Sequence, residues 1–375
     1  MRHKWLFLGL ILLITLFSGC WDISEINRRT IVVALGLDAT EDGKVKVSLQ
    51  IPLAQSVSAR TETNQPPTKT FYTITNEAES PMAAIEGLQS KTGNDLFYGQ
   101  LKVVIFGASL ARNGLLAITD FLQRVPVLPP QGLMLLADGV AEEIISKEVS
   151  SREVPGLVIL NFLEQSAKSD LAFPLSGWQL VRGVNFDTED IFLPVISFEP
   201  QEETFIIKGI GVFHHDRLVG ILSDTETRMF GFLTGRARNA APSLVAQHSN
   251  VGLGRVSYRV MANTKTKAFV DGEQLRFLVN VKLKGSLVES TKAETRLSLE
   301  EVRELEKAAE QKFKSEMMKT VRHLQELNSD VLGFGELLRA MHPKAYRRLN
   351  WDREFPRVPV QVKVKFNLEQ SGSFR

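Results

Sequence analysis

The amino-terminal twenty residues constrain the fold most, because they end in the only cysteine of the chain. A basic start precedes an apolar run from Trp5 to Phe17, and the small residues Ser18 and Gly19 come directly before Cys20. A basic start, a short apolar run and small residues at a cleavage site form the three-part layout of an export signal. The run has about 13 residues, fewer than the ~20 that a helix needs to cross a bilayer.

We therefore predict that residues 1–19 are a lipoprotein signal peptide and that Cys20 becomes the acylated amino terminus. Acyl chains such as palmitate on its thiol and amine would anchor the protein, since each buried CH₂ contributes ~0.8 kcal/mol. The alternatives are an ordinary signal peptide and an uncleaved anchor. Phe17 stands where lipoprotein signals usually have Leu, although Leu16 lies beside it. With Cys20 in the anchor, the body has no thiol for a disulfide or a metal, so its fold rests on hydrophobic cores.

Length and charge indicate more than one domain. The chain has 375 residues, more than the ~250–300 at which single cores stop growing. Its 43% hydrophobic and 23% charged residues are typical of globular proteins, and no later apolar run is long enough to span a membrane. The net charge of +2 hides an acidic stretch, 22–204, followed by a basic one, 205–375. The asymmetry suggests different partners for each part, docking of one part on the other, or attraction of the basic part to an anionic membrane. The alternative is two independently solvated surfaces.

The first half alternates between strand and helix patterns. An Asp-Gly turn at 42–43 predicts a hairpin, and the second strand of that hairpin alternates apolar residues. Pro194 suggests that the strand at 191–198 lies at a sheet edge. We expect strands at 30–37, 44–52, 70–75, 100–106, 132–137 and 191–198, and helices at 80–91, 109–122, 142–148 and 156–168. This pattern predicts a mixed α/β domain over residues 20–200, which would be one body or two.

The second half is predicted to be α+β, over residues 204–370. The polar stretch 199–203 is taken as the boundary, followed by a hairpin whose strands flank residues 214–217. Ser298 and Glu301 form a capping box for the longest helix, whose apolar stripe runs from Val302 to Leu327. We expect this helix to pack on antiparallel strands of its own domain; the alternative is a partner-binding or coiled-coil helix. The strands are expected at 256–263, 274–290 and 358–368.

The sequence offers little that resembles a catalytic or metal site. It has no HExxH, no Gly-x-Ser-x-Gly and no Walker A sequence. His214 and His215 are expected to be solvated turn residues, because no other His or Cys stands at metal-ligand spacing. A cation at Asp187, Glu189 and Asp190 would lack the spacing of an EF-hand loop. Tyr and Trp do not interleave with the basic residues, which argues against nucleic acid. We predict that the protein is not an enzyme and has no metal or cofactor.

Three stretches together resemble one family. The first is Gly19-Cys20-Trp21-Asp22 leading into the Ile-Val-Val-Ala-Leu-Gly-Leu-Asp run at 31–38. The second is Gly-Ile-Gly-Val-Phe at 209–213 with Asp-Arg-Leu-Val-Gly at 216–220. The third is Asp-Val-Leu-Gly-Phe-Gly-Glu at 330–336 with His-Pro-Lys at 342–344 and Trp351. In order and spacing they resemble the spore germination lipoproteins of the Ger(x)C family, the C subunits of Ger-type nutrient germinant receptors.

The resemblance implies a lipid-anchored, non-catalytic receptor subunit on the outer face of the spore inner membrane. It would support nutrient-triggered germination through contacts with an integral-membrane A-type subunit and a transporter-like B-type subunit. It also implies a mixed α/β body of about three domains. The alternative function is a solute-binding lipoprotein that delivers a small ligand to a membrane transporter, a class usually built from two doubly wound lobes. An anchored hydrolase is a third possibility, which no catalytic motif supports.

Overall fold

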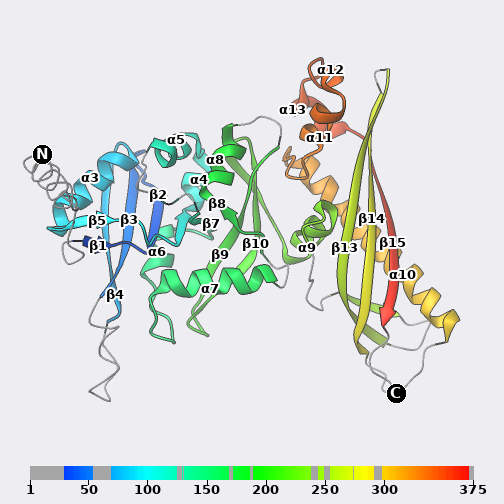
Figure 1. Cartoon of the computed structure of the whole chain (residues 1–375), viewed down its shortest axis with the longest axis horizontal. Helices are drawn as coiled ribbons and strands as arrows, with labels where there is room; N and C mark the ends of the chain where they lie inside the picture. Colours follow the sequence, from blue (N-terminus) through cyan, green and yellow to red (C-terminus); the bar gives the residue numbers. More distant parts are fainter. Residues whose placement is uncertain are drawn as a thin grey trace, which may run out of the picture.

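The computed structural model describes residues 29–53, 69–124, 129, 131–168, 172–185, 189–237, 244–248, 254–272, 274–290 and 298–370. The signal peptide at 1–19 and the lipidation site Cys20 lie outside the described residues, so both stay predictions. Among the helices in the described ranges, none is long and apolar enough to cross a membrane. The described residues form two main sheets with helices packed on them (Figure 1).

The first half is built on a nine-stranded mixed sheet with the order β11-β10-β9-β7-β6-β2-β3-β4, in which β8 pairs with β7. Strands β2, β6, β7 and β9 are parallel, and antiparallel hairpins extend both edges. The short strands β1 (Arg29–Ile31) and β5 (Asp95–Phe97) pair separately. The strands of the large sheet are β2 (Ala34–Ala39), β3 (Val45–Pro52), β4 (Phe71–Ala78), β6 (Val103–Phe106), β7 (Leu133–Ala137), β8 (Leu175–Ser176), β9 (Phe192–Glu199), β10 (Thr204–His214) and β11 (Arg217–Leu222).

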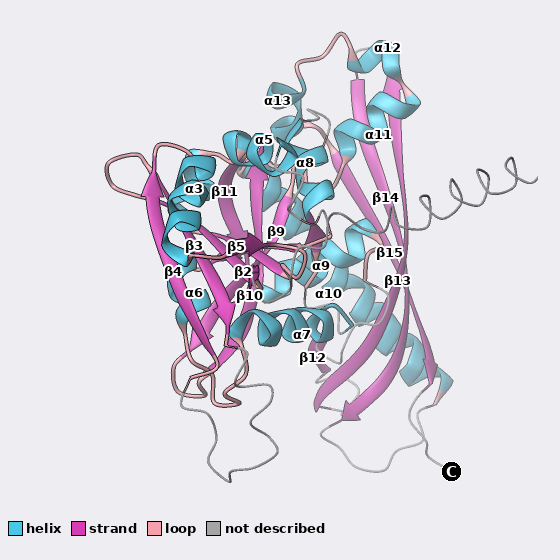
Figure 2. Ribbon diagram, turned by 60° about the vertical axis from the view of Figure 1, so that its left-hand side comes forward, coloured by secondary structure: helices cyan, strands magenta, loops and turns pink. Residues whose placement is uncertain are grey.

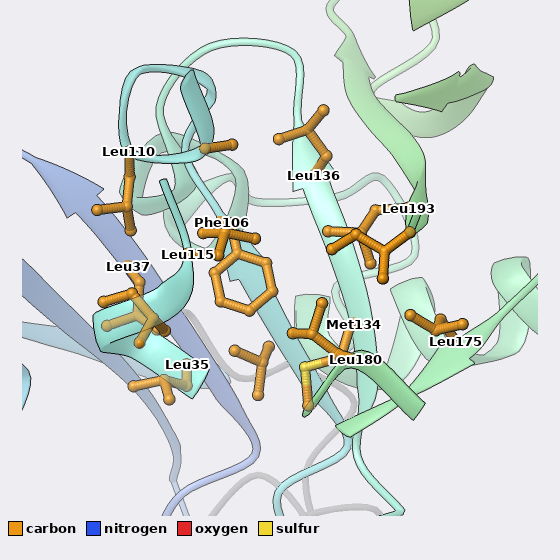
Figure 3. Close-up of a cluster of buried hydrophobic side chains, with 14 of the residues drawn as sticks. Leu35, Leu37, Phe106, Leu110, Leu115, Met134, Leu136, Leu175, Leu180 and Leu193 are labelled. Atoms are coloured by element: carbon orange, nitrogen blue, oxygen red, sulfur yellow. The ribbon is translucent and has the colours of Figure 1, made fainter. Parts of the chain in front are cut away.

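Helices cover both faces of this sheet because its central strands are apolar on both sides. One face, with Leu37 and Phe106, packs against α3, α4, α5 and α8. Figure 3 shows Leu37 and Phe106 of this face together with Leu110 of α4 and Leu180 of α8. The other face, with Ile105 and Leu135, packs against α6 and α7. The helices of this half are α3 (Pro81–Thr92), α4 (Ala108–Asn113), α5 (Leu116–Arg124), α6 (Ala141–Ser146), α7 (Pro155–Lys168), α8 (Gly177–Asn185) and α9 (Asp224–Thr234). The expected α/β half is confirmed.

The second half is a four-stranded sheet in the order β12-β13-β14-β15 with a long helix on one face. In Figure 2, α10 lies along this sheet and α11, α12 and α13 gather at one end of it. The elements are β12 (Leu244–His248), β13 (Gly254–Asp271), β14 (Gln274–Ser290), α10 (Leu299–Glu326), α11 (Phe334–Met341), α12 (Pro343–Tyr346), α13 (Trp351–Glu354), the 3₁₀ turn η2 (Phe355–Arg357) and β15 (Val360–Gln370). The α+β class is confirmed, and α10 packs on its own domain as expected.

One strand of this sheet runs in an unexpected direction. β12, β13 and β14 are antiparallel, but β15 is parallel to β14. The alternation of Val360, Val362 and Val364 identifies the buried face of a strand but carries no information about its direction. The direction follows from α10, which returns the chain to the starting end of β14 before β15 begins. α10 also protects the outer edge, where Glu310 accepts a bond from the Phe366 N–H (3.0 Å) and Glu306 from the Leu368 N–H (2.9 Å).

The edge position expected from Pro194 is wrong. β9 lies inside the large sheet, between β7 and β10. Pro194 pairs with Ile210, where the register of β10 shifts between Ile207 and Ile210, and Gly209 there has φ +114°. A β-bulge leaves a strand locally unpaired, so a residue without an N–H is tolerated at this point.

The hairpin β10–β11 belongs to the large sheet, although the sequence placed it in the second half. The polar stretch 199–203, expected to link two domains, is the turn between β9 and β10, with Glu199 paired to Thr204. Polar composition and a proline mark an exposed turn as readily as a linker. By sheet membership the first body extends through β11, while the domain limits at 200 and 204 stay a prediction.

Helix α9 lies between the two sheets and contributes to both cores (Figure 1). Phe230 packs in the core of the large sheet, whereas Met229 and Phe232 pack with α10 in the core of the second sheet. Val331 and Leu324 also reach into the first core. The two halves are therefore joined by shared apolar contacts, and the polar site described below lies at this junction.

Replacing Ser298 with alanine is expected to lower the free energy of unfolding by about 1 kcal/mol. The Ser298 side chain accepts a bond from the Glu301 N–H (3.2 Å), and Glu301 accepts one from the Ser298 N–H (2.7 Å). Urea denaturation followed by circular dichroism would measure the loss. Ser315→Ala, on an exposed position inside the same helix, is the matched control and should change stability by less than ~0.5 kcal/mol. Equal midpoints for the two variants would contradict this role of the capping box.

Candidate functional site

The candidate site is a set of polar side chains where the two halves meet. Three segments converge there: the turn between β10 and β11, the residues just before β9, and the segment 328–336 that leads into α11. Asp190 joins all three. One of its carboxylate oxygens accepts from the His215 N–H and the other from the Asp330 N–H, both at 2.7 Å. Ser329 donates from its hydroxyl to the carbonyl of Phe213.

Asp330 is the fully buried centre of this site. Its carboxylate accepts from the backbone N–H of Phe334 (2.9 Å) and of Gly335 (2.6 Å), and from the indole Nε1–H of Trp351 (3.0 Å). Burial raises the pKa of Asp330 to about 8, although the bonds from Gly335, Phe334 and Trp351 each oppose that rise. The carboxyl therefore ties the start of α11 to α13, two segments that are adjacent only in the folded chain.

The local sequence explains how Asp330 reaches this position. Gly333 adopts φ +72°, a left-handed conformation that glycine favours, and its N–H donates to the Asp330 carbonyl (3.1 Å). The turn places the first N–H groups of α11 over the carboxyl oxygens, which satisfy donors that have no partner within the helix. Phe334 then stacks on Phe277 of β14, with ring centroids 4.7 Å apart. The motif at 330–336 is thus a turn, a helix start and a core anchor in one segment.

Asp38 is a second buried carboxylate, and it binds the backbone N–H groups of a helix start in the first half. It accepts from the N–H groups of Ala141 (2.8 Å) and Glu142 (2.9 Å) at the start of α6. Burial raises its pKa, and these two bonds work against that rise. Asp38 is the last residue of the first family-like stretch, 31–38, and Asp330 is the first residue of the third, 330–336. Both buried carboxylates are engaged by helix N–H groups, so their perturbed pKa values reflect structural roles rather than a catalytic pair.

His215 lies on the turn as expected, whereas His214 is the last residue of β10 and is partly buried, so the expectation of two solvated turn residues is only half confirmed. Their ring centroids are 4.2 Å apart. His214 Nδ1 lies 3.6 Å from the Asp190 carboxylate, and His215 Nε2 lies 3.3 Å from Asp352 Oδ2 on α13. The Asp190 carboxylate raises the pKa of His214. Because 137 residues separate His215 from Asp352, spacing along the sequence could not reveal this contact.

Of the three acidic residues considered for a cation in the sequence, the two that the structure describes, Glu189 and Asp190, have different partners. Asp187 lies outside the described residues. Glu189 pairs with Arg236 (3.7 Å), and burial raises the pKa of Glu189. Both line a cleft of about 210 Å³ between α8 and α11, together with Trp178 and a Glu336–Arg339 ion pair (2.7 Å). Most charges of this cleft are therefore paired with each other.

Comparisons with known proteins agree with the resemblance seen in the sequence. Residues 22–198 match the family "Spore germination protein N-terminal domain", and residues 208–372 match "Spore germination B3/GerAC like, C-terminal". Residues 199–207, which lie between the two matched regions, fall within the hairpin β9–β10. The matched regions contain the segments that position Asp38 and Asp330, respectively.

Curated relatives match along nearly their whole length. The putative spore germination protein YfkR of Bacillus subtilis is 24% identical, with 96% of this chain and 95% of the relative covered. Spore germination protein B3 of Bacillus subtilis is 21% identical (95% and 94% covered), and GerQC of Bacillus cereus is 20% identical (97% and 98% covered).

A solved structure shares the fold. The crystal structure of the GerBC protein superimposes with a TM-score of 0.55 at 20% identity, over 89% of this chain and 96% of that one. Taken with the two domain matches and the full-length relatives, it shows that this chain belongs to the Ger(x)C family of spore germination proteins.

Proposed function

We propose that this protein is the lipid-anchored, non-catalytic C subunit of a spore germinant receptor. It would be held by Cys20 on the outer face of the spore inner membrane and act in nutrient-triggered germination through protein contacts. The observation that carries the proposal is the match to named spore germination proteins over 94–98% of their own lengths. A chain that keeps the full domain order of its relatives has the parts needed for the same role.

The buried polar groups favour a role without catalysis. A general base must reach a substrate proton at hydrogen-bond distance. Asp38 and Asp330 instead accept two and three bonds from protein N–H groups and are buried. Their roles are the same as those of helix caps. We infer that the polar junction sets the geometry between the two halves and so shapes the surface that partners would contact.

The solute-binding alternative has less support. That class usually has two doubly wound lobes, whereas the second half here is a four-stranded sheet with one long helix. The junction cleft, about 210 Å³, is smaller than the ~300–1,000 Å³ typical of ligand pockets, and its charges are largely paired. Titration of the full chain with candidate nutrients by calorimetry would test this alternative, which saturable tight binding would favour over the receptor proposal.

We expect affinity purification of the tagged chain from detergent-solubilised spore membranes to recover an integral-membrane A-type subunit and a transporter-like B-type subunit. The reason is that a subunit with the proposed non-catalytic role would act through partners in the same membrane. Mass spectrometry would identify them, and an unrelated spore lipoprotein with the same tag is the control. Recovery of neither membrane subunit, or equal recovery with the control, would refute the proposal.

A further inference from the structure

We propose that His214, His215 and Asp352 form a binding site for a transition-metal ion, Zn²⁺ or one of similar chemistry, that bridges the two halves of the protein. The three side chains each offer one ligand atom, and these atoms lie within 4.8 Å of one another. His215 Nε2 and Asp352 Oδ2 are already 3.3 Å apart. The inference concerns these residues alone and does not depend on the proposed receptor role.

The turn brings the two imidazoles to the same side. Consecutive residues of a regular strand point to opposite faces of the sheet. His214 ends β10, and His215 adopts φ +55°, which breaks that alternation and places the two rings 4.2 Å apart. The Asp190 carboxylate holds the His215 N–H at 2.7 Å and so fixes this uncommon backbone conformation.

The third ligand is positioned from the other half. Asp352 follows Trp351, whose buried indole is bonded to Asp330, and Asn350 caps the short helix α13 through the Arg353 N–H (3.2 Å). The carboxylate is half-exposed, as is the His215 ring. Asp352 thus stands at the junction on a fixed backbone but keeps the side-chain freedom to close on an ion.

The donor set favours zinc-like ions over calcium and magnesium. Zn²⁺ takes imidazole nitrogen and carboxylate oxygen at ~2.0–2.2 Å, so tetrahedral ligand atoms lie about 3.3 Å apart. The His215–Asp352 pair has this separation, and the His214 ring has to approach by about 1.5 Å at most. Ca²⁺ and Mg²⁺ prefer oxygen ligands throughout. A water molecule would complete the tetrahedron.

Asp190 would orient the His214 ring for metal binding without being a ligand itself. Its carboxylate lies 3.6 Å from Nδ1 of His214, and this nitrogen is buried without a hydrogen-bond partner. Metal-bound histidines commonly have a carboxylate beside the ring that orients it and raises its basicity. The competing interpretation is a plain contact between His215 and Asp352 that binds no metal, and the experiment below separates the two.

The test is calorimetric titration of ZnCl₂ into the full-length chain, purified in detergent and stripped with EDTA. We expect one zinc per chain. We also expect the thermal unfolding midpoint to rise by about 3–5 °C at zinc concentrations near 100 times the dissociation constant, because binding would join the two halves. Replacing either ligand, by His215→Asn or Asp352→Asn, should weaken zinc binding about 100-fold; asparagine is chosen at 215 because it tolerates the left-handed backbone conformation. Asp190→Asn should weaken zinc binding about 10-fold.

His342→Ala is the matched control, because it removes a histidine that lies outside the cluster, and it should bind zinc as the wild type does. Circular dichroism would verify that each variant is folded. Absence of saturable binding by the wild type, or binding by His215→Asn and Asp352→Asn that is as tight as that of the wild type, would overturn the site. Binding without any rise in the unfolding midpoint would overturn the bridge.

Discussion

Replacing Asp330 with alanine is expected to lower the free energy of unfolding by about 3–5 kcal/mol, because it leaves buried donors without an acceptor. The N–H groups of Phe334 and Gly335 and the indole N–H of Trp351 all donate to this carboxyl. Within the described part of the chain, the Trp351 indole donates to no side chain other than Asp330. We therefore expect the start of α11 and the position of α13 to be disturbed together.

Urea denaturation monitored by tryptophan fluorescence and by circular dichroism would measure this loss. Asp330→Asn keeps one carbonyl oxygen and should cost less than the alanine variant. Asp271→Asn, on an exposed residue at the end of β13, is the matched control and should change stability by less than ~0.5 kcal/mol. A loss below ~1 kcal/mol for Asp330→Ala would show that the junction does not depend on this carboxyl.

The wild type and Asp330→Asn also allow the protonation of Asp330 to be tested through the pH dependence of stability. The pKa of Asp330 rises from 3.8 to about 8 on folding, so the folded protein holds a proton that the unfolded chain releases. The stabilisation linked to that proton is complete below pH ~4 and is lost as the pH rises through about 8. Asp330→Asn cannot titrate, so its stability relative to the wild type should improve between pH 5 and 8. An unchanged or opposite difference would mean that the three N–H donors keep Asp330 ionised.

Local patterns in the sequence were sufficient for the fold class and for most elements. The helix α8 and the short strands β5, β8 and β12 were not predicted, and α4 and α5 were expected as one helix. The capping box at Ser298 and Glu301 forms as expected, and the stripe from Leu305 to Val321 is buried against the second sheet. The Asp-Gly turn at 42–43 joins β2 to β3. Each of these features is determined by residues within a few positions of one another, and local propensity and periodicity are informative over that range.

Long-range partners could not be predicted in the same way. Alternation in β15 shows its buried face but not its direction, and Pro194 indicated an edge because the bulge in the neighbouring strand is invisible from β9 alone. The motif around Asp330 identified the family, yet its bond to Trp351 depends on how α11 and α13 fold back. The contact of His215 with Asp352 likewise exists only after both halves dock.

Replacing Cys20 with alanine is expected to release the protein from the membrane and to abolish its contribution to germination. Without the thiol no diacyl group can be attached, so acylation should be abolished and the apolar chains that hold the protein at the bilayer should be absent. Membrane fractionation with immunoblotting and metabolic labelling with a fatty acid would measure attachment. Ser18→Ala keeps a small residue near the cleavage site and is the matched control, expected to be acylated and bound.

A chimeric protein would separate the anchor from the contacts it allows. Fewer than ten residues lie between Cys20 and β1, so the membrane would be within about 30 Å of Arg29. β1 lies at the opposite end of the molecule from the second sheet (Figure 1), so the anchor would bring the α/β half closest to the bilayer. If proximity is all that Cys20 supplies, a transmembrane helix in place of residues 1–20 should restore germination to the Cys20→Ala strain. Normal attachment and normal germination of the Cys20→Ala strain itself would refute the anchoring proposal.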